Sequence, residues 1–328
     1  MKVEIFTALF VSFGTTGLRS EETAPLRLVK SISLLGAEGR MDHMAVDLEG
    51  KRLFLAALGN NSVEVVSLEA GKEVQRIYQC KEPQGVAFVP GSKEVVVACG
   101  KDGACRVYDS LSLKLKAAAD YKDDADNVRF DPATQRVFVG YGKGALGAMD
   151  LKGAKLADVI LEGHPESFQL EKKGKRIFVN VPSAGHVAVV DREKNRVTAT
   201  WPVDAKGNFP MALDEDHHRL FLGCRSPAQL LVLDAESGKK VASLPASGDA
   251  DDLFYDPQAK RIYLSCGEGL IDVFEAMDPD HFKLSGKVPT ALGARTSLFV
   301  PELNALYLAV PHHGDQRAEL RVYEPVAK

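Results

Sequence analysis

Acidic side chains recur at one position of this sequence, each a few residues before an apolar, strand-forming run. The recurring residues are Asp42, Asp126, Glu166 and Asp251. Carboxylates that converge on one place repel one another unless a cation, a shared proton or basic neighbours compensate for their charge. Carboxylate oxygens are the ligands that Ca²⁺ and Mg²⁺ prefer. We therefore expect these four residues to bind a divalent cation, with Ca²⁺ or Mg²⁺ favoured.

Other polar side chains flank the four carboxylates and extend the expected ligand site. The flanking residues are Arg40, His43, Asp124, Asn127, His164, Asp252 and Arg295. Histidine nitrogens would admit Zn²⁺, Mn²⁺ or Cu²⁺ as less favoured alternatives. His43 and Asp126 are candidates for acid–base work, although the pattern assigns no catalytic residue. Two other interpretations stay open: a metal-free pocket for a polar ligand, and a structural network that caps turn N–H groups.

The elements that carry these residues form a sevenfold repeat. Each unit has an apolar strand, a polar turn and a stronger second strand. The equivalent second-strand residues are Leu53, Val95, Val137, Ile177, Leu220, Ile262 and Leu306, at steps of 42, 42, 40, 43, 42 and 44 residues. A period of about 40–45 residues with several strands per unit is typical of propeller blades. We predict an all-β, seven-bladed propeller of four-stranded antiparallel blades, whose top loops place the recurring carboxylates around the central channel.

The seventh unit ends after its third strand, at residues 320–323, and residues 26–34 alternate between apolar and polar side chains. Pairing of residues 26–34 onto the last blade would close the ring and remove an exposed sheet edge. We therefore expect one domain over residues 25–328. At the bottom turns, basic residues stand beside acidic ones and predict repeated ion pairs. These are Arg52, Arg136, Arg176, Arg219 and Arg261 beside Asp47, Asp131, Glu171, Asp214 and Asp256.

The repeats contain Asp-Pro-x-x-(Lys/Arg)-Arg-(Ile/Val)-(Tyr/Phe)-(Val/Leu), followed by Val-x-Val-x-Asp-x-x-x-Gly-Lys. The tetrads within them are residues 137–140, 177–180 and 262–265. These motifs resemble the YVTN-type β-propeller family, in particular its YncE-like members, over nearly the whole chain after residue 24. The resemblance implies the seven-bladed fold. It implies no single activity, because similar propellers include lactone hydrolases, a lyase, nucleic-acid binders and surface-layer modules.

Composition narrows the possible partners and compartments. The net charge of −4 and the acidic site argue against nucleic acid as a partner. Residues 1–24, with a basic start, an apolar stretch and a polar exit, resemble a secretory signal peptide, so we expect export to the periplasm or the medium, with the cytoplasm as the alternative. In an exported chain, Cys99 and Cys105 would form a disulfide across a turn, or remain free thiols. No apolar run is long enough for a transmembrane helix.

Three classes of function remain. The favoured one is a propeller that binds a small ligand or a metal ion at the top of its channel, as a monomer. The second is a lactonase-like hydrolase or lyase that uses a channel metal. The third is a scaffold that binds a protein partner on the top face. Residues 142–147 match G-x-G-x-x-G but join two antiparallel strands, so we expect no nucleotide cofactor.

Overall fold

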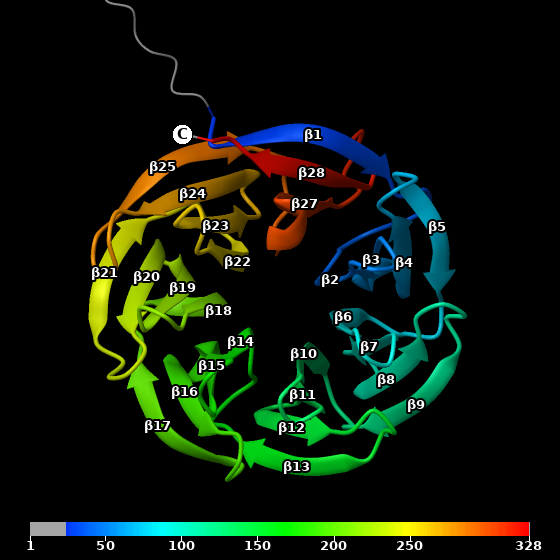
Figure 1. Cartoon of the computed structure of the whole chain (residues 1–328), viewed down its shortest axis with the longest axis horizontal. Helices are drawn as coiled ribbons and strands as arrows, with labels where there is room; N and C mark the ends of the chain where they lie inside the picture. The colour runs from blue at the N-terminus through cyan, green and yellow to red at the C-terminus, as the bar shows by residue number, and fades with distance from the viewer. Residues whose placement is uncertain (1–23, 328) are drawn as a thin grey trace, which may run out of the picture.

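A computed structural model describes residues 24–327 of the chain. These residues form seven four-stranded antiparallel sheets, arranged as blades in a ring around a central channel (Figure 1). The predicted fold class is therefore confirmed. The leader predicted over residues 1–24 lies outside the described residues, apart from residue 24 itself.

Six blades are built from consecutive strands, ordered from the channel outward. Blades 1 to 3 contain β2 (Met44–Asp47), β3 (Arg52–Ala57), β4 (Ser62–Ser67), β5 (Lys72–Ile77); β6 (Pro83–Val89), β7 (Glu94–Cys99), β8 (Ala104–Asp109), β9 (Leu115–Asp120); and β10 (Ala125–Asp131), β11 (Arg136–Tyr141), β12 (Ala145–Met149), β13 (Lys155–Ile160). Blades 4 to 6 contain β14 (Phe168–Leu170), β15 (Arg176–Val181), β16 (His186–Asp191), β17 (Arg196–Pro202); β18 (Lys206–Asp214), β19 (Arg219–Ser226), β20 (Ala228–Asp234), β21 (Lys240–Pro245); and β22 (Ala250–Asp256), β23 (Arg261–Cys266), β24 (Leu270–Ala276), β25 (Phe282–Pro289). Short 3₁₀ turns lie at Leu58–Asn60, Pro182–Ala184 and Pro301–Leu303.

Blade 7 combines the two ends of the described chain. It contains β26 (Ser297–Val300), β27 (Ala305–Val310) and β28 (Glu319–Pro325), and β1 (Leu26–Ser33) adds the outermost strand. β1 pairs antiparallel with β28, from Leu26 opposite Pro325 to Ser33 opposite Glu319, with a bulge between Leu28 and Lys30. The predicted closure of the ring is confirmed, and it leaves no unpaired edge on β28.

Apolar side chains fill the spaces between blades. The described residues contain seven buried apolar clusters, one between each pair of neighbouring blades. Second strands are buried on both faces; all six residues of β7 are buried. Such strands are near-continuous runs of β-branched and aliphatic residues, because both of their faces must exclude water. Each blade is therefore held rigidly by its two neighbours.

The innermost strands β2, β6, β10, β14, β18, β22 and β26 line the channel (Figure 1). The top loops feed directly into them. The pairing of β10 with β11 is interrupted between Ala125 and Val128, and that of β22 with β23 between Ala250 and Asp252. Such irregularities re-aim side chains at the end of a strand. Here they affect Asp126, Asn127 and Asp251.

The bottom ion pairs form in some blades only. Arg52 lies 2.7 Å from Asp47, and Arg176 lies 2.5 Å from Glu171, as predicted. Four of the other predicted residues have different partners. Arg219 pairs with Asp234 and Asp280, Asp214 pairs with His217, Asp131 pairs with Arg192, and Arg261 donates to the carbonyls of Pro25 and Val326.

The five cysteines are free and buried. Cys99 lies opposite Ala104, and Cys105 lies opposite Ala98. Adjacent positions on paired strands point to opposite faces of a sheet. Accordingly, Cys99 packs between blades 1 and 2, whereas Cys105 packs between blades 2 and 3. The blade itself separates the two thiols, so the structure agrees with the free-thiol alternative and not with the disulfide.

Candidate functional site

The top loops bring most of the predicted site residues to one small pocket at the channel mouth. Arg40, Asp42, His43, Asp126, Asn127, Glu166 and Asp251 line it, together with Ser167 and Phe209. The other four predicted residues contact this group directly or through one partner. Asp252 contacts His43, His164 contacts Asp126, Asp124 lies near His164, and Arg295 contacts Asp251. Equal positions in different blades therefore do form a ring.

Backbone hydrogen bonds fix the loops that carry the ring. The amide of Asp42 donates to the carbonyl of Ala56 at 2.8 Å. The amide of His43 donates to the carbonyl of Gln84, in the next blade, at 3.2 Å. The two residues therefore lie at the junction of blades 1 and 2, and rigid strands on both sides hold their side chains over the channel.

His43 reaches Asp252 and Asp42, whose charges favour its protonated form. Its Nδ1 lies 3.3 Å from Asp252, and its Nε2 lies 3.5 Å from Asp42. Burial opposes the charge, but these two carboxylates outweigh burial and raise the pKa of His43 to about 10. The amide of Asn127 lies 3.3 Å from Nε2. The Oδ1 of Asn127 is buried and has no hydrogen-bond partner among the described residues.

Two carboxylates of the ring are compensated by guanidinium groups. Arg40 donates to Asp42 at 2.8 Å. Burial raises the pKa of Asp42 to about 7, and the charges of His43 and Arg40 oppose this rise. Asp251 lies 2.7 Å from Arg225 and 3.0 Å from Arg295. Burial also raises the pKa of Asp251, against the pull of these two arginines.

Arg225 is a site residue outside the set predicted from the sequence. Its guanidinium stacks on the ring of Phe209 at 3.9 Å and donates to Asp251. Arg225 belongs to β19, in the blade before Asp251. The sequence contained one signal for this contact: Arg225 is a basic residue in the blade that precedes the acidic ring residue Asp251.

Glu166 is the ring carboxyl that has no ion-pair partner among the described residues. Burial, with a further contribution from the charge of Asp126, raises its pKa to about 8. Glu166, Asp126 and His164 each offer one ligand atom, and these atoms lie within 4.8 Å of one another. Of the four predicted metal ligands, Asp126 and Glu166 belong to this cluster. Asp42 and Asp251 lie outside it and are held by basic side chains.

The orientation of His164 suits a metal ligand. Its Nδ1 lies 2.6 Å from the carbonyl of Gly142, which can only accept, so Nδ1 carries a proton. Its Nε2 points at Asp126, 3.4 Å away. Burial opposes the charge of His164, but Asp126 and Gly142 outweigh it and raise the pKa to about 9. In the neutral ring the lone pair would lie on Nε2, and a carbonyl on the other nitrogen is the usual support of a metal-bound histidine.

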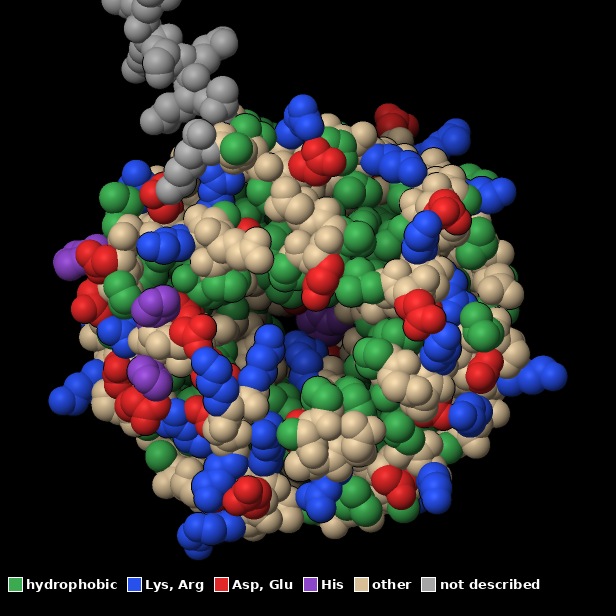
Figure 2. Space-filling view, viewed as in Figure 1, with side chains coloured by type: hydrophobic (Ala, Val, Ile, Leu, Met, Phe, Trp, Pro, Cys, Tyr) green, Lys and Arg blue, Asp and Glu red, His purple; other side chains and the backbone are tan. Residues whose placement is uncertain are grey.

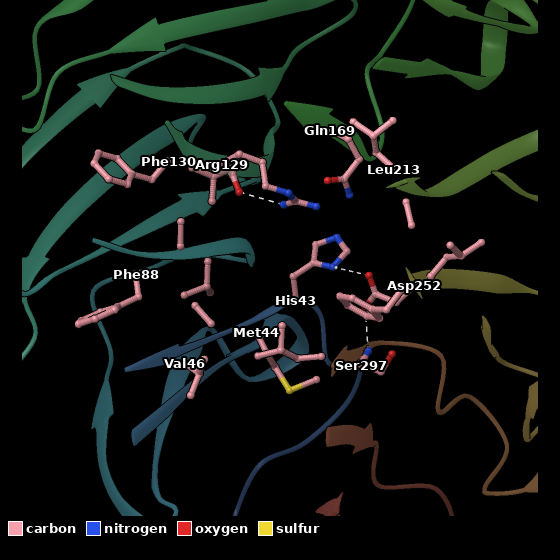
Figure 3. Close-up of a pocket in the computed structure, with 18 of the residues that line it drawn as sticks. His43, Met44, Val46, Phe88, Arg129, Phe130, Gln169, Leu213, Asp252 and Ser297 are labelled. Carbon is pink, nitrogen blue, oxygen red and sulfur yellow. Dashed lines mark hydrogen bonds and ion pairs between the residues drawn. The ribbon is translucent and has the colours of Figure 1, made fainter. Parts of the chain in front are cut away.

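A second, larger cavity lies in the channel on the other side of His43. Its volume is about 590 Å³, and the innermost strands of all seven blades line it. Its polar lining residues include His43, Asp252, Arg129 and Gln169 (Figure 3). In the space-filling view a histidine side chain is visible inside the hollow at the middle of the ring (Figure 2). The sequence did not indicate this cavity, since its walls belong to strands that looked like ordinary core.

Comparisons with known proteins support the fold alone. No protein-family model matches the chain, and no curated protein matches it. Among solved structures, hydrazine synthase of Kuenenia stuttgartiensis is similar, with a TM-score of 0.74 over 84% of this chain and 95% of that one, at 15% sequence identity. At this identity the likeness shows a shared propeller fold and carries no activity. No helix in the described residues is long and apolar enough to cross a membrane.

Proposed function

We propose that this propeller binds a divalent cation at the top mouth of its channel through Asp126, His164 and Glu166, and presents it to a small polar ligand. The observation that carries the proposal is the convergence of three ligand atoms within 4.8 Å. The three residues come from the first-strand ends and top loops of blades 3 and 4. Their convergence therefore requires blades 3 and 4 to be folded against each other.

The charge distribution around the ring supports this choice of ligands. Asp42, Asp251 and Asp252 each have a basic partner, but Glu166 has none among the described residues. Without a cation, Glu166 keeps its proton near neutral pH, as its pKa of about 8 indicates. A divalent ion would displace this proton together with the one on His164 Nε2. The cluster then becomes two carboxylates and one neutral imidazole.

The donor set narrows the choice of metal. Imidazole nitrogen suits Zn²⁺ and Mn²⁺ better than Ca²⁺ or Mg²⁺, which prefer oxygen throughout. Three protein ligands leave a coordination position for water or a ligand, as in catalytic zinc sites. The donor set therefore favours Zn²⁺ or Mn²⁺, which the sequence analysis gave as the less favoured ions.

The proposal also includes membership of the YVTN-type, YncE-like family, export of the protein and a monomeric state. The repeat motifs support the family, and the apolar segment after Met1 supports export.

Metal titration of chelator-treated protein tests the proposal. We expect Zn²⁺ or Mn²⁺ to bind with one ion per chain and to raise the melting temperature, since a ligand that binds only the folded state stabilises it. Glu166→Gln should abolish both effects. Glu302→Gln, which changes an exposed carboxylate on blade 7, is the matched control and should retain them. If none of Zn²⁺, Mn²⁺, Ca²⁺ and Mg²⁺ binds stoichiometrically, the proposal fails.

A metal-dependent hydrolase is the second candidate, and the position of Asp42 favours it. Asp42 lines the same pocket as Asp126 and Glu166, and its pKa of about 7 suits a general base near neutral pH. The bound ion would polarise a carbonyl and lower the pKa of its water. With Zn²⁺ or Mn²⁺ supplied, we expect Asp42→Asn to keep metal binding but to lose lactone hydrolysis. Lactonase activity in Asp42→Asn equal to wild type would exclude this role.

A further inference from the structure

The channel cavity below His43 has the features of a second ligand site. We propose that it binds an organic anion with a single carboxylate and an apolar body, such as a medium-chain fatty acid, with the carboxylate on Arg129. The cavity volume of about 590 Å³ lies within the usual range for small-molecule pockets. The proposal does not depend on metal binding at the top mouth, because His43 separates the two spaces.

The cavity exists because small residues stand at one position of the innermost strands. Eight residues before each second-strand anchor stand Ala45, Ala87, Arg129, Gln169, Ala212, Phe254 and Leu298. All seven line the cavity. Three alanines leave the channel open where larger side chains would fill it. Further wall residues such as Val46, Phe88 and Phe130 are apolar, so a hydrocarbon or aromatic body would be well accommodated.

Arg129 is a cation on this wall that forms no ion pair with any residue the structure describes. Its one hydrogen bond to protein goes to the carbonyl of Val128 at 2.9 Å, and the ring of Phe168 lies 5.5 Å away. Burial lowers the pKa of Arg129, which shows that the charge is held at a cost. The guanidinium keeps free N–H groups in a planar fork. That geometry matches a carboxylate through two parallel hydrogen bonds.

The remaining charged groups that line the cavity leave a net positive potential. The carboxylate of Asp252 is engaged by His43 at 3.3 Å and by the backbone N–H of Ser297 at 2.8 Å. Lys172 adds a second cation, on the turn between β14 and β15. Asp126, whose charge also reaches Arg129, is paired with His164. Lys172 is exposed at the bottom turn, so half-buried Arg129 is the cation of the inner wall that lacks an ion-pair partner among the described residues, and a ligand with one negative charge would compensate for it.

Gln169 gives the ligand a direction. It stands on β14, in the blade next to Arg129 and at the same level of the channel (Figure 3). Its Nε2 donates to the carbonyl of Met211 at 2.8 Å, and the second hydrogen of that amide remains for a ligand. The carboxylate would therefore lie between Arg129 and Gln169, close to His43. The apolar body would extend past Phe88 and Phe130 toward the bottom turns at Pro90 and Pro132.

Calorimetric titration of the chelator-treated protein with decanoate and decanol tests the proposal. We expect decanoate to bind roughly tenfold or more tightly than decanol, because only the carboxylate makes charge-assisted hydrogen bonds to Arg129. Arg129→Gln should remove this difference. Arg196→Gln is the matched control, because Arg196 is exposed on the outermost strand β17 of blade 4 and loses the same charge.

Each result of these titrations either supports or overturns the proposed acid site. Equal affinities of decanoate and decanol for the wild type would overturn the proposal, even if Arg129→Gln failed to fold. Decanoate binding that survives Arg129→Gln would place the acid elsewhere and would also overturn it. The chelator keeps the top mouth free of metal throughout, and Glu166→Gln should bind decanoate as the wild type does. Failure of the metal site would thus be distinguished from failure of the acid site.

Discussion

The carboxylates of the ring have equal positions in the sequence repeat but different chemical states. Asp42 and Asp251 lie against guanidinium groups, Asp126 lies against His164, and Glu166 has no ion-pair partner among the described residues. Basic partners come from a neighbouring loop or the preceding blade. The charge of each carboxylate is therefore decided by contacts between blades, and this explains why one of them remains available to a cation.

Glu166 makes the metal-free protein lose stability as the pH rises. Its pKa of about 8 in the fold exceeds the ordinary 4.5, so the unfolded chain releases the proton first. The stability of the fold then falls between about pH 4.5 and pH 8. In chelator, Glu166→Gln should remove this part of the fall and be more stable than wild type by roughly 2 kcal/mol at pH 8, with little difference near pH 4.5. Urea unfolding across this range measures it.

The exposed substitution Glu302→Gln should leave the pH profile unchanged. A variant Glu166→Gln that is less stable than wild type at pH 8 would show that Glu166 is ionised in the free protein, and that an unseen partner compensates for its charge.

His43 contributes stability that also falls as the pH rises, over a higher pH range than for Glu166. Its pKa rises from 6.5 to about 10 on folding, so its contribution is complete below pH 6.5 and is lost as the pH rises toward 10. His43→Gln leaves Asp42 and Asp252 facing each other without the cation, which should cost about 3 kcal/mol at pH 7. The variant should also lack the part of the decline between pH 6.5 and 10 that His43 causes. Thermal unfolding at several pH values would show both effects.

His313→Gln, an exposed histidine on the loop between β27 and β28, is the control and should behave as wild type. If His43→Gln keeps the stability and pH profile of the wild type, then His43 is not the cation that holds the two carboxylates.

The sequence repeat was enough to predict which residues meet at the top mouth, because equal positions in a closed ring must meet. It was not enough to predict their partners. Arg225 reaches Asp251 from the preceding blade, and the set that could hold a metal contains His164 but neither Asp42 nor Asp251. These contacts depend on side-chain direction at strand irregularities near residues 125–128 and 250–252, which no spacing rule encodes.

At the scale of elements, β1 completes blade 7, as its sequence predicts. Leu26 and Ile32 are each 2% exposed, whereas Leu28 is 48% exposed. Within β1 the buried residues are Leu26 and Ile32; the residues between them are exposed, and a bulge lies between Leu28 and Lys30. Arg261 of blade 6 donates to the carbonyls of Pro25 and Val326, and thereby holds both ends of the closure.

A charge on the buried face of β1 should therefore open the ring. Ile32→Asp places a carboxylate at a buried position and should destabilise the fold by at least about 3 kcal/mol, with aggregation through the freed edge of β28. Leu28→Asp, the matched control on the exposed face, should change stability by no more than about 0.5 kcal/mol. Melting temperature and light scattering measure these effects. Similar melting of both variants would contradict the role of β1 as the closing strand.

The overall propeller fold was the easiest feature to predict from the sequence, and the cavity in its channel was the hardest. Seven similar units with short strands specify a propeller, because each blade can bury its faces only against another blade. The hollow of the channel has another origin. It depends on Ala45, Ala87 and Ala212 standing at one level, and on Arg129 standing among them. In sequence, these are unremarkable residues of core strands, so neither the cavity nor its cation could be foreseen.

The closure of blade 7 has a consequence for how the chain can be cut. Leu26 lies opposite Pro325 at the outer edge of the ring, so a short linker could join them. The turn at Lys152 and Gly153, between β12 and β13, could then supply new ends. Such a circular permutant would close blade 3 with β13 as its first strand, in the way that β1 now closes blade 7. We expect it to fold and to melt close to wild type, because every blade has the same two neighbours and the ring has no inherent starting point.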